Sequence, residues 1–351
     1  MKTYRNLYPQ VWDFENLYLA YRKARKGKRG RPGAAAFERV QDDELLALQD
    51  ELRDLTYNPG PYHSFYIHDP KKRLISAAPF RDRVVHHALC RVIEPLWEQR
   101  FIYDTYANRV GKGTHRALDR ATQFARRYSH FLQCDIRQFF PSIDHEILRA
   151  EFARLICDDS LLWLCDRILE SGEGVLADEY EMAWFPGDNL LAASRPRGLP
   201  IGNLTSQFWA NVYLNSLDHF IKRELKCSGF VRYVDDFLLY SNDPDQLSDW
   251  RTAIIERLAS LRLSLHEEST RIFPTVSGIP FLGFRLYPDH RRIKRRKVVT
   301  YRRKLRRLLD DFATGGVPFS EVDASLKGWV NYVRQADSWG LRRDIFGSFA
   351  L

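Results

Sequence analysis

The stretch Phe230-Val231-Arg232-Tyr233-Val234-Asp235-Asp236-Phe237-Leu238-Leu239-Tyr240 decides the fold of this chain. Strand-forming apolar residues flank the two aspartates on both sides, so the stretch predicts a β-hairpin with two acids at its turn. An Asp-Asp pair is common at turns, because short acidic side chains bond to nearby backbone groups. Taken alone, the stretch predicts a structure and no chemistry.

A third acid, Asp135, follows a second compact apolar run, Phe131-Leu132-Gln133-Cys134. By itself it would be a turn or helix-cap residue. Together, carboxylates at the ends of two strand-like runs predict a site for divalent cations, which relieve the repulsion between the acids. Two such ions about 4 Å apart can activate an attacking oxygen and stabilise a leaving pyrophosphate. Hard oxygen ligands favour Mg²⁺, with Mn²⁺ as a substitute.

Composition sets the class of protein. The chain has 351 residues, of which 44% are hydrophobic, enough to form a core divided into two or three subdomains. Lys and Arg total 54 against 45 Asp and Glu, a formal net charge of +9. This excess indicates a surface that meets a polyanion, although charge alone does not identify it.

The sequence also predicts a location. No apolar run approaches the roughly 20 residues that span a bilayer, and the polar first residues lack the apolar core of a signal peptide. We expect a cytoplasmic protein with no membrane partner. The five cysteines are odd in number and lack a Cys-x-x-Cys pair, so we expect them to be reduced and mostly buried.

Periodicity outlines the secondary structure. It predicts strands at 62–67 and 71–75, and helices near 42–55, 84–97, 115–128 and 301–312, with another after the turn Gly198-Leu199-Pro200-Ile201-Gly202. The basic run at 22–33 interrupts helical periodicity, so we expect a loop there, either solvated or in contact with phosphate.

Two segments of the sequence resemble motifs of a known protein family. Asp135-Ile136-Arg137-Gln138-Phe139-Phe140 and Tyr233-Val234-Asp235-Asp236 resemble the metal-binding motifs of the reverse transcriptase palm. The resemblance implies an α+β, right-hand polymerase fold with fingers, a palm built on an antiparallel sheet with packed helices, and a helical thumb. It assigns 1–61 to an N-terminal extension, 62–130 to the fingers, 131–288 to the palm with a fingers-proximal insertion near 150–197, and 289–351 to the thumb. Asp135, Asp235 and Asp236 would be catalytic and would bind two metal ions together with Ile136.

The same resemblance implies a nucleotide pocket. Lys71-Lys72-Arg73-Leu74-Ile75 is similar to the fingers strand that grips the triphosphate, so Lys72 and Arg73 would neutralise phosphate charge. Phe140 stands where the family places an aromatic gate against a 2′-hydroxyl. Ile201, Gly202 and Gln207 would lie in the pocket floor. Outside this context the two cations would be surface residues and Phe140 a core residue.

Further along the chain, Phe281-Leu282-Gly283-Phe284 resembles the primer-grip turn, with Phe281, Leu282 and Gly283 facing the primer. Gly328-Trp329-Val330-Asn331-Tyr332 resembles the thumb of group II intron relatives. Cations of the thumb would track an RNA–cDNA heteroduplex through its backbone, although a solvated charged helix is the alternative. These cations are Arg291, Arg292, Lys294, Arg295, Arg296, Lys297, Arg302 and Arg303.

One motif points to a subtype. Leu199-Pro200-Ile201-Gly202-Asn203-Leu204-Thr205-Ser206-Gln207 has Ile and Gln where most bacterial relatives have Gln and Pro. This form resembles the enzymes of diversity-generating retroelements, as does Trp184-Phe185-Pro186-Gly187-Asp188. The resemblance implies deoxynucleoside triphosphates, a template-repeat RNA copied with errors at adenines, and an oligomeric accessory variability protein as partners.

Some questions stay open from the sequence. Ser269 stands where many relatives have a lysine that could protonate pyrophosphate, and His266 is a weak substitute, expected at the surface. A retron or group II intron type enzyme is the alternative within the family. A catalytically silent RNA-binding scaffold is the alternative outside enzymes, but it would be expected to have lost an acidic ligand.

Overall fold

The structure is a computed structural model that describes residues 3–68 and 72–347. Contacts divide it into two compact units. The first comprises Met1–Tyr103, Asp135–Lys226 and Thr252–Glu267, and the second Asp104–Cys134, Cys227–Arg251 and Glu268–Leu351. The expected palm contributes to both units, and the limits of fingers, palm and thumb stay a prediction.

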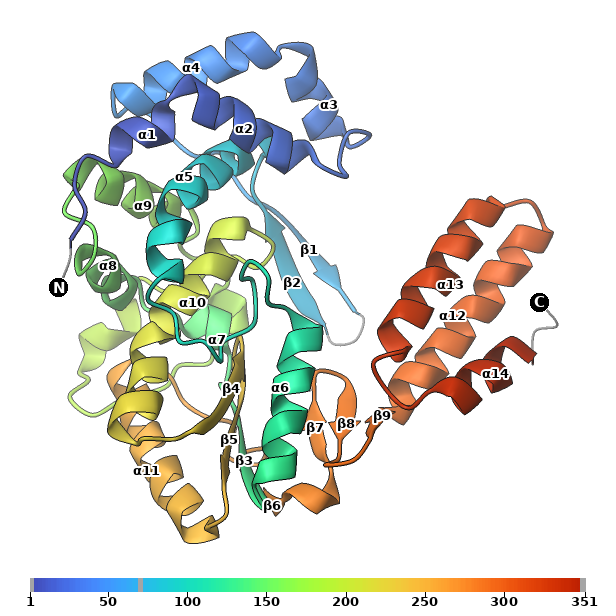
Figure 1. Ribbon diagram of the computed structural model, residues 1–351. Helices are drawn as coiled ribbons and strands as arrows, with labels where there is room; N and C mark the ends of the chain where they lie inside the picture. Colours follow the sequence, from blue (N-terminus) through green and yellow to red (C-terminus); the bar gives the residue numbers. More distant parts are fainter. Residues whose placement is uncertain (1–2, 69–71, 348–351) are drawn as a thin grey trace. The chain divides into compact units, whose positions relative to one another are not determined.

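The first unit is mainly helical (Figure 1). Its long helix α5 (Phe80–Glu98) packs against α2 and α10. The other elements of this unit are α1 (Tyr8–Trp12), α2 (Phe14–Arg25), α3 (Pro32–Arg39), α4 (Gln41–Arg53), β1 (His63–Ile67), β2 (Arg73–Ala77), α7 (Phe139–Ser142), α8 (His145–Ala153), α9 (Asp159–Ser171) and α10 (Leu204–His219). The expected helices near 42–55 and 84–97 correspond to α4 and α5.

The basic run at 22–33 is only partly the loop that the sequence predicts. Its first residues complete α2 and its last two begin α3. Basic side chains in the last turn of α2 interact favourably with the negative end of the helix dipole, which explains why the helix continues into the run. Pro32 is suited to a first helical turn because it needs no hydrogen-bond acceptor there.

A two-stranded sheet joins β1 and β2 in antiparallel register, with Ile67 opposite Arg73. The strands expected at 62–67 and 71–75 are thus confirmed within the described residues, with the second displaced toward Ala77. Lys71 lies outside those residues.

Asn203 connects this sheet to the turn before α10. Its side-chain amide donates to the carbonyls of Ser76 (2.9 Å) and Pro200 (3.1 Å), and its oxygen accepts from the N–H of Ala78 at 3.1 Å. The side chain is buried. The expected helix after the turn is confirmed as α10, and Asn203 holds its N-terminus against β2.

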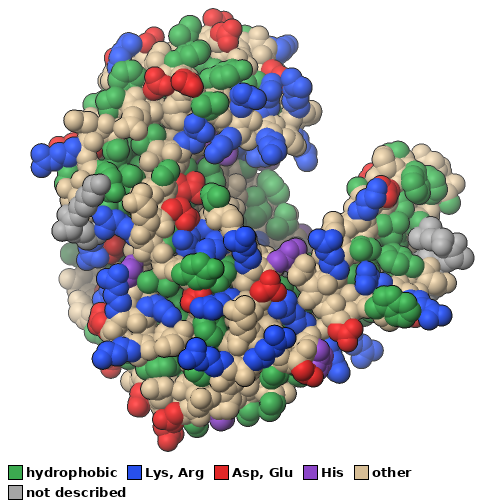
Figure 2. Space-filling model, viewed as in Figure 1, with side chains coloured by type: hydrophobic (Ala, Val, Ile, Leu, Met, Phe, Trp, Pro, Cys, Tyr) green, Lys and Arg blue, Asp and Glu red, His purple; other side chains and the backbone are tan. Residues whose placement is uncertain are grey.

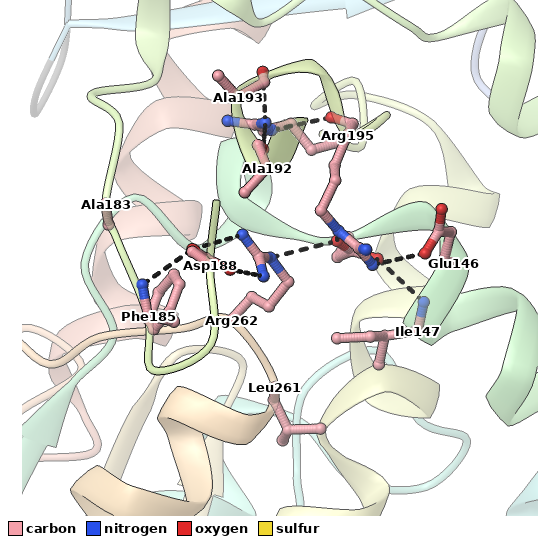
Figure 3. Close-up of polar contacts among 12 residues, drawn as sticks. Glu146, Ile147, Ala183, Phe185, Asp188, Ala192, Ala193, Arg195, Leu261 and Arg262 are labelled. Carbon is pink, nitrogen blue, oxygen red and sulfur yellow. Dashed lines mark hydrogen bonds and ion pairs between the residues drawn. The ribbon is translucent and has the colours of Figure 1, made fainter. Parts of the chain in front are cut away.

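A network of ion pairs holds the segment that carries Trp184-Phe185-Pro186-Gly187-Asp188 (Figure 3). The guanidinium of Arg262 forms two bonds with the Asp188 carboxylate, 2.5 and 2.9 Å, and its Nε lies 3.5 Å from Asp144. Arg195 pairs with Asp144 and with Glu146. Hydrogen bonds from Arg262 hold the pKa of Asp188 below its usual range. Opposite charges alternate along these contacts, so the buried Asp144 carboxylate has Arg195 and Arg262 as counter-ions.

The second unit contains a four-stranded sheet with the order β4-β5-β3-β6 and a three-stranded sheet with the order β7-β8-β9. Helix α6 (Thr114–Arg127) packs against β4, β5 and β8. The strands are β3 (His130–Asp135), β4 (Gly229–Tyr233), β5 (Asp236–Ser241), β6 (Ile272–Pro274), β7 (Ile279–Phe281), β8 (Phe284–Leu286) and β9 (Arg291–Ile293), and α11 (Pro244–Ser260) follows β5. The expected hairpin, the strand before Asp135 and the helix near 115–128 are confirmed.

The C-terminal part of the second unit is helical, with α12 (Arg295–Ala313), α13 (Phe319–Val333) and α14 (Trp339–Gly347). Trp329 stacks on Tyr301 with ring centres 4.4 Å apart, which joins α13 to α12. The basic segment begins as strand β9, paired with β8, before α12 starts. The expected helix at 301–312 is confirmed inside α12.

Two further expectations concern membranes and cysteines. No helix among the described residues is long and apolar enough to cross a bilayer. All the cysteines except Cys157 are buried, as expected.

The Asn203 contacts generate a stability prediction. Asn203→Ala should lower the free energy of unfolding by about 2–4 kcal/mol, because it leaves buried backbone groups without hydrogen bonds. The matched control is Asn189→Ala, an exposed asparagine whose side-chain oxygen accepts from the Leu191 N–H, for which we expect a loss of about 0.5 kcal/mol or less. Urea unfolding measures both, and equal losses would show that the Asn203 contacts add nothing.

Candidate active site

The hairpin β4-β5 carries two of the candidate acids. Tyr233 pairs with Asp236, so Val234 and Asp235 form a two-residue turn. The strands are buried, whereas the turn residues and Asp236 are half-buried. Val234 has φ 59°, a conformation that costs a β-branched residue about 1–2 kcal/mol. Strain of this kind persists only where the surrounding structure enforces it, and it is concentrated at functional sites.

Arg232 helps to enforce this turn. Its guanidinium donates to the Val234 carbonyl at 2.9 Å, and its side chain is buried. The backbone of Arg232 also bonds to the segment before α6, donating to Asp104 and accepting from Tyr106, both at 3.0 Å. A buried cation thus lies three residues before Asp235, the first acid of the turn. A lone Arg inside an apolar strand is the sequence signal that marks this residue.

Asp135 is the last residue of β3, the strand beside β5 in the sheet order. Two residues earlier, the Gln133 amide donates to the Asp236 carboxylate at 3.4 Å and to the Pro280 carbonyl at 3.0 Å. Gln133 therefore connects an acid of the hairpin with β7. This positioning residue is also absent from the sequence prediction, because its contacts depend on strand order.

The chain after Asp135 is paired with the segment that follows α11. The Asp135 carbonyl accepts from the His266 N–H at 2.9 Å, and Ile136 forms a bridge with Leu265. His266 is exposed, as expected, and lies beside Asp135 through its backbone. Ser269 is exposed in a turn. The segment holds Asp135 and Ile136 in place, and a role for His266 in proton transfer stays a prediction.

Among residues 3–68 and 72–347, no group of three or more His, Cys, Asp or Glu side chains is arranged to hold a metal ion. Asp135 belongs to the first compact unit, and Asp235 and Asp236 to the second. The donor types suit Mg²⁺, because all three are carboxylates. Their joint role, with Ile136, stays a prediction.

Several expected nucleotide-pocket residues meet within the first unit. The Phe140 carbonyl accepts from Leu199 at 2.9 Å, and the Ile201 carbonyl accepts from Ser76 at 2.8 Å. Gly202 has φ 120°, and a Cβ there would lie 3.0 Å from the Ile75 side chain. The turn that precedes α10 is thus fixed between α7 and β2. Its glycine is required both by the backbone conformation and by the close approach of β2.

The side chains of this group differ in environment. The Phe140 ring is half-buried and lies 5.4 Å from the buried ring of Phe139. The Lys72 ammonium lies 4.1 Å above the Tyr66 ring, and Arg73 is exposed on β2. Gln207 is exposed on the first turns of α10. Lys72, Arg73 and Gln207 therefore present polar atoms to solvent, as ligand-binding groups require.

The expected primer grip is the turn between β7 and β8. Leu282 and Gly283 both have positive φ, 47° and 89°, the backbone of a tight hairpin turn. A Cβ on Gly283 would collide with the hydroxyl of Tyr332. The Tyr332 ring also lies 4.9 Å from Phe284. Within the second unit, the glycine thus permits close packing of α13 on the turn, and contact with a primer stays a prediction.

The expected thumb cations fall into two groups. Arg291 is bound to the Thr122 hydroxyl and to Asp119, both at 2.8 Å, so it anchors β9 to α6. Arg302 is ion-paired with Asp344. The exposed cations are Arg292, Lys294, Arg295, Arg296, Lys297 and Arg303. Lys and Arg side chains are also spread over the rest of the face shown in Figure 2, so basic surface is not confined to α12.

Comparisons with known proteins identify the family. Residues 67–286 match the model of the reverse transcriptase (RNA-dependent DNA polymerase) family. Protein YkfC of Escherichia coli is 25% identical over 301 residues, covering 73% of this chain and 74% of that protein. The group II intron-encoded protein LtrA of Lactococcus lactis is 24% identical over 231 residues, covering 63% of this chain and 36% of LtrA.

A plant intron maturase and a solved telomerase structure are also similar to parts of this chain. Nuclear intron maturase 2, mitochondrial, of Arabidopsis thaliana is 31% identical over 134 residues, which is 33% of this chain and 18% of that protein. The chain thus spans little more than a third of LtrA and less of the maturase. Among solved structures, apo telomerase from Candida tropicalis matches with a TM-score of 0.49 and 10% identity, covering 70% of this chain and 59% of the telomerase.

The family model covers well over half of the chain, including the hairpin Tyr233-Val234-Asp235-Asp236 and the strand that ends at Asp135. The α+β fold described above is that of the family. The chain belongs to the reverse transcriptase family, the RNA-directed DNA polymerases with a right-hand fold, which act on an RNA template and deoxynucleoside triphosphates.

Proposed function

We propose that this reverse transcriptase is the polymerase of a diversity-generating retroelement and makes error-prone cDNA from a template-repeat RNA. The observation that carries the proposal is Ile201, an apolar residue in the turn before α10. The backbone of this turn is fixed by Ser76 and Asn203, so its side-chain chemistry can change without loss of the turn. The resemblance of 199–207 and 184–188 to that subtype supports the same conclusion.

Asp135, Asp235 and Asp236 are proposed as the metal ligands, together with the backbone of Ile136. Two Mg²⁺ ions, or Mn²⁺ in their place, would activate the attacking oxygen and stabilise charge on the leaving group. The chain itself supplies the carboxylates. Gln133 and Arg232 are positioning residues that fix Asp236 and the turn through the contacts described above.

Nucleotide and nucleic-acid binding are assigned to residues that expose polar or aromatic groups. Lys72 and Arg73 would neutralise triphosphate charge, Phe140 would lie against the sugar, and Ile201, Gly202 and Gln207 would border the base. The exposed cations of β9 and α12 would bind the backbone of the heteroduplex. We further propose an oligomeric accessory variability protein as a partner, on the basis of the subtype resemblance alone, and a cytoplasmic location.

A group II intron type enzyme is the second candidate. Similarity to LtrA and to the Arabidopsis intron maturase favours it. The two candidates differ in the cDNA they would make. A retroelement enzyme of the proposed subtype makes errors selectively at template adenines, whereas the alternative predicts no such selectivity.

The first prediction concerns the proposed metal ligands. Asp135→Asn should reduce primer extension on an RNA template by about 10²-fold or more, because it removes a ligand charge. The control Asp178→Asn changes an exposed acid in the first unit and should extend at the wild-type rate. A folded Asp135→Asn protein that also extends at that rate would remove Asp135 from the site.

The second prediction concerns the proposed sugar gate. Phe140→Ala should raise ribonucleotide incorporation relative to deoxyribonucleotide incorporation by removing bulk beside the 2′-carbon. Phe139→Ala is the matched control, since it removes the neighbouring, fully buried ring and should reduce stability by about 3 kcal/mol or more without changing this ratio. Single-nucleotide incorporation assays measure the ratio, and the same value for Phe140→Ala and wild type would reject the gate.

The third prediction concerns fidelity. Ile201→Gln should reduce misincorporation opposite template adenine more than opposite other bases, because a side-chain amide can hydrogen-bond near the base pair and an isoleucine cannot. A difference of about 1.4 kcal/mol in discrimination changes the error frequency roughly tenfold. Ile201→Val keeps the apolar character and should retain the error spectrum. Sequencing cDNA from one template tests all three enzymes, and identical spectra from active enzymes would reject the role of Ile201.

A further inference from the structure

An apolar groove in the first unit is lined by the segment Trp184-Phe185-Pro186, which no step of the proposed reaction uses. The rest of its lining comes from α11 and the segment that follows it, between Ile255 and Glu267. The groove has a volume of about 610 Å³. This lies within the range of about 300–1,000 Å³ that ligand pockets have, so the groove is large enough to receive several side chains of a partner.

Large apolar side chains are exposed along this part of the surface. Trp184 is 56% exposed, and Leu190 and Leu191, a little further along the chain, are 86% and 75% exposed. On α11, Ile255 is 46% exposed. Pro186 lines both this groove and the neighbouring pocket that contains Leu191, which makes the apolar surface continuous. Single exposed apolar residues are ordinary, but a continuous group of them marks a surface that a partner covers.

The exposed segment is held in a fixed position (Figure 3). Arg262 forms two hydrogen bonds of 2.5 and 2.9 Å with Asp188, and its guanidinium lies 5.4 Å from the centre of the Phe185 ring. The Phe185 N–H donates to the same carboxylate at 2.9 Å. A surface that is already ordered loses little conformational entropy when a partner binds. The exposed Trp184 is thus part of an ordered surface, ready to contact a partner.

The backbone of the groove favours a helical partner over an extended one. Binding by strand addition needs a row of unpaired backbone groups along a sheet edge. None of the strands in the described part of the chain lines the groove, and Leu265 belongs to an isolated bridge. The backbone groups of α11 are bonded within that helix. A helix that inserts apolar side chains between Trp184 and α11 therefore fits this surface.

The charge of the lining selects the kind of helix. Within residues 3–68 and 72–347, the charged residues that line the groove are Glu256 and Glu267, both exposed, and no Lys or Arg lines it. The groove is therefore acidic, although the whole chain has a formal net charge of +9. Arg262, which lies behind this lining, is neutralised by Asp188. Two exposed carboxylates at an apolar groove complement a helix that carries Lys or Arg beside its apolar side chains.

We propose that this groove binds a basic amphipathic helix of a partner protein. The apolar side chains of the helix would pack on Trp184 and Ile255, and its cations would face Glu256 and Glu267. Tryptophan is enriched among the residues that contribute most to protein interfaces, so Trp184 is the expected anchor. The interaction goes beyond DNA synthesis and does not depend on the retroelement subtype.

The test uses the full chain, purified free of nucleic acid, and two fluorescent helical peptides. Both peptides have leucine on one face, and the other face is lysine in one and glutamate in the other. Fluorescence anisotropy should show saturable binding of the leucine–lysine peptide to the wild type. Trp184→Ser should weaken that binding at least about tenfold. Glu256→Gln combined with Glu267→Gln should also weaken it and should flatten its salt dependence.

Trp339→Ser is the matched control, because this tryptophan is 65% exposed and belongs to α14 in the second unit. It should bind the leucine–lysine peptide as the wild type does, and urea unfolding should show that both tryptophan variants are folded. The leucine–glutamate peptide reports on binding to basic surface elsewhere, so its affinity should not depend on Trp184.

Three results would overturn the proposal. One is a wild type that does not bind the leucine–lysine peptide, or binds it no better than Trp184→Ser does. Another is an equal loss of both peptides in Trp184→Ser. The third is a wild-type dimer that Trp184→Ser dissociates in sedimentation, which would assign the groove to a second copy of the chain. Primer extension without peptide reports separately on the polymerase and should be the same in Trp184→Ser and wild type.

Discussion

Holding like charges at the edge of an apolar sheet is the constraint on which the rest of this structure depends. The strands β4 and β5 are buried, yet the turn between them carries two adjacent carboxylates. Carboxylates next to one another repel, and a sheet edge does not hold them without further contacts. The structure provides these contacts through the strained Val234 turn, the buried Arg232 guanidinium and the Gln133 amide. Each of them comes from the second unit, so this unit fixes the geometry of the hairpin acids by itself.

In the first unit, the turn before α10 is likewise fixed by individual hydrogen bonds and not by a long helix or strand. Asn203 does so by bonding to Ser76 of β2, a residue 127 positions earlier in the chain. The Ile201 carbonyl is bound by the same strand. Backbone contacts therefore define the turn, and the Ile201 side chain is available for a different function. This separation of backbone structure from side-chain chemistry explains how a subtype could exchange a polar residue for an apolar one while retaining the fold.

Much of the fold could be predicted from the sequence because the palm motifs combine compact apolar runs with acids at their ends. Periodicity sufficed for the hairpin, the strand before Asp135, α10 and α12. It failed where contacts between distant segments decide the structure. From the sequence, Arg291 is expected to be a thumb cation that binds nucleic acid. In the structure it is bound to Asp119 and Thr122 and anchors β9 to α6. Gln133 lies beside Asp236 only because β3 neighbours β5 in the sheet, an order that periodicity does not predict.

DNA synthesis by this polymerase is expected to require divalent metal bound by Asp135, Asp235 and Asp236. The most direct measurement is the rate of DNA synthesis by the purified wild-type chain on a primed RNA template as Mg²⁺ is titrated from zero. No synthesis is expected in chelator, and the rate should rise with Mg²⁺ and be restored by Mn²⁺ after Mg²⁺ is removed. Synthesis that persists in chelator would contradict the account, as would a folded, RNA-binding protein that makes no DNA at any concentration of either metal.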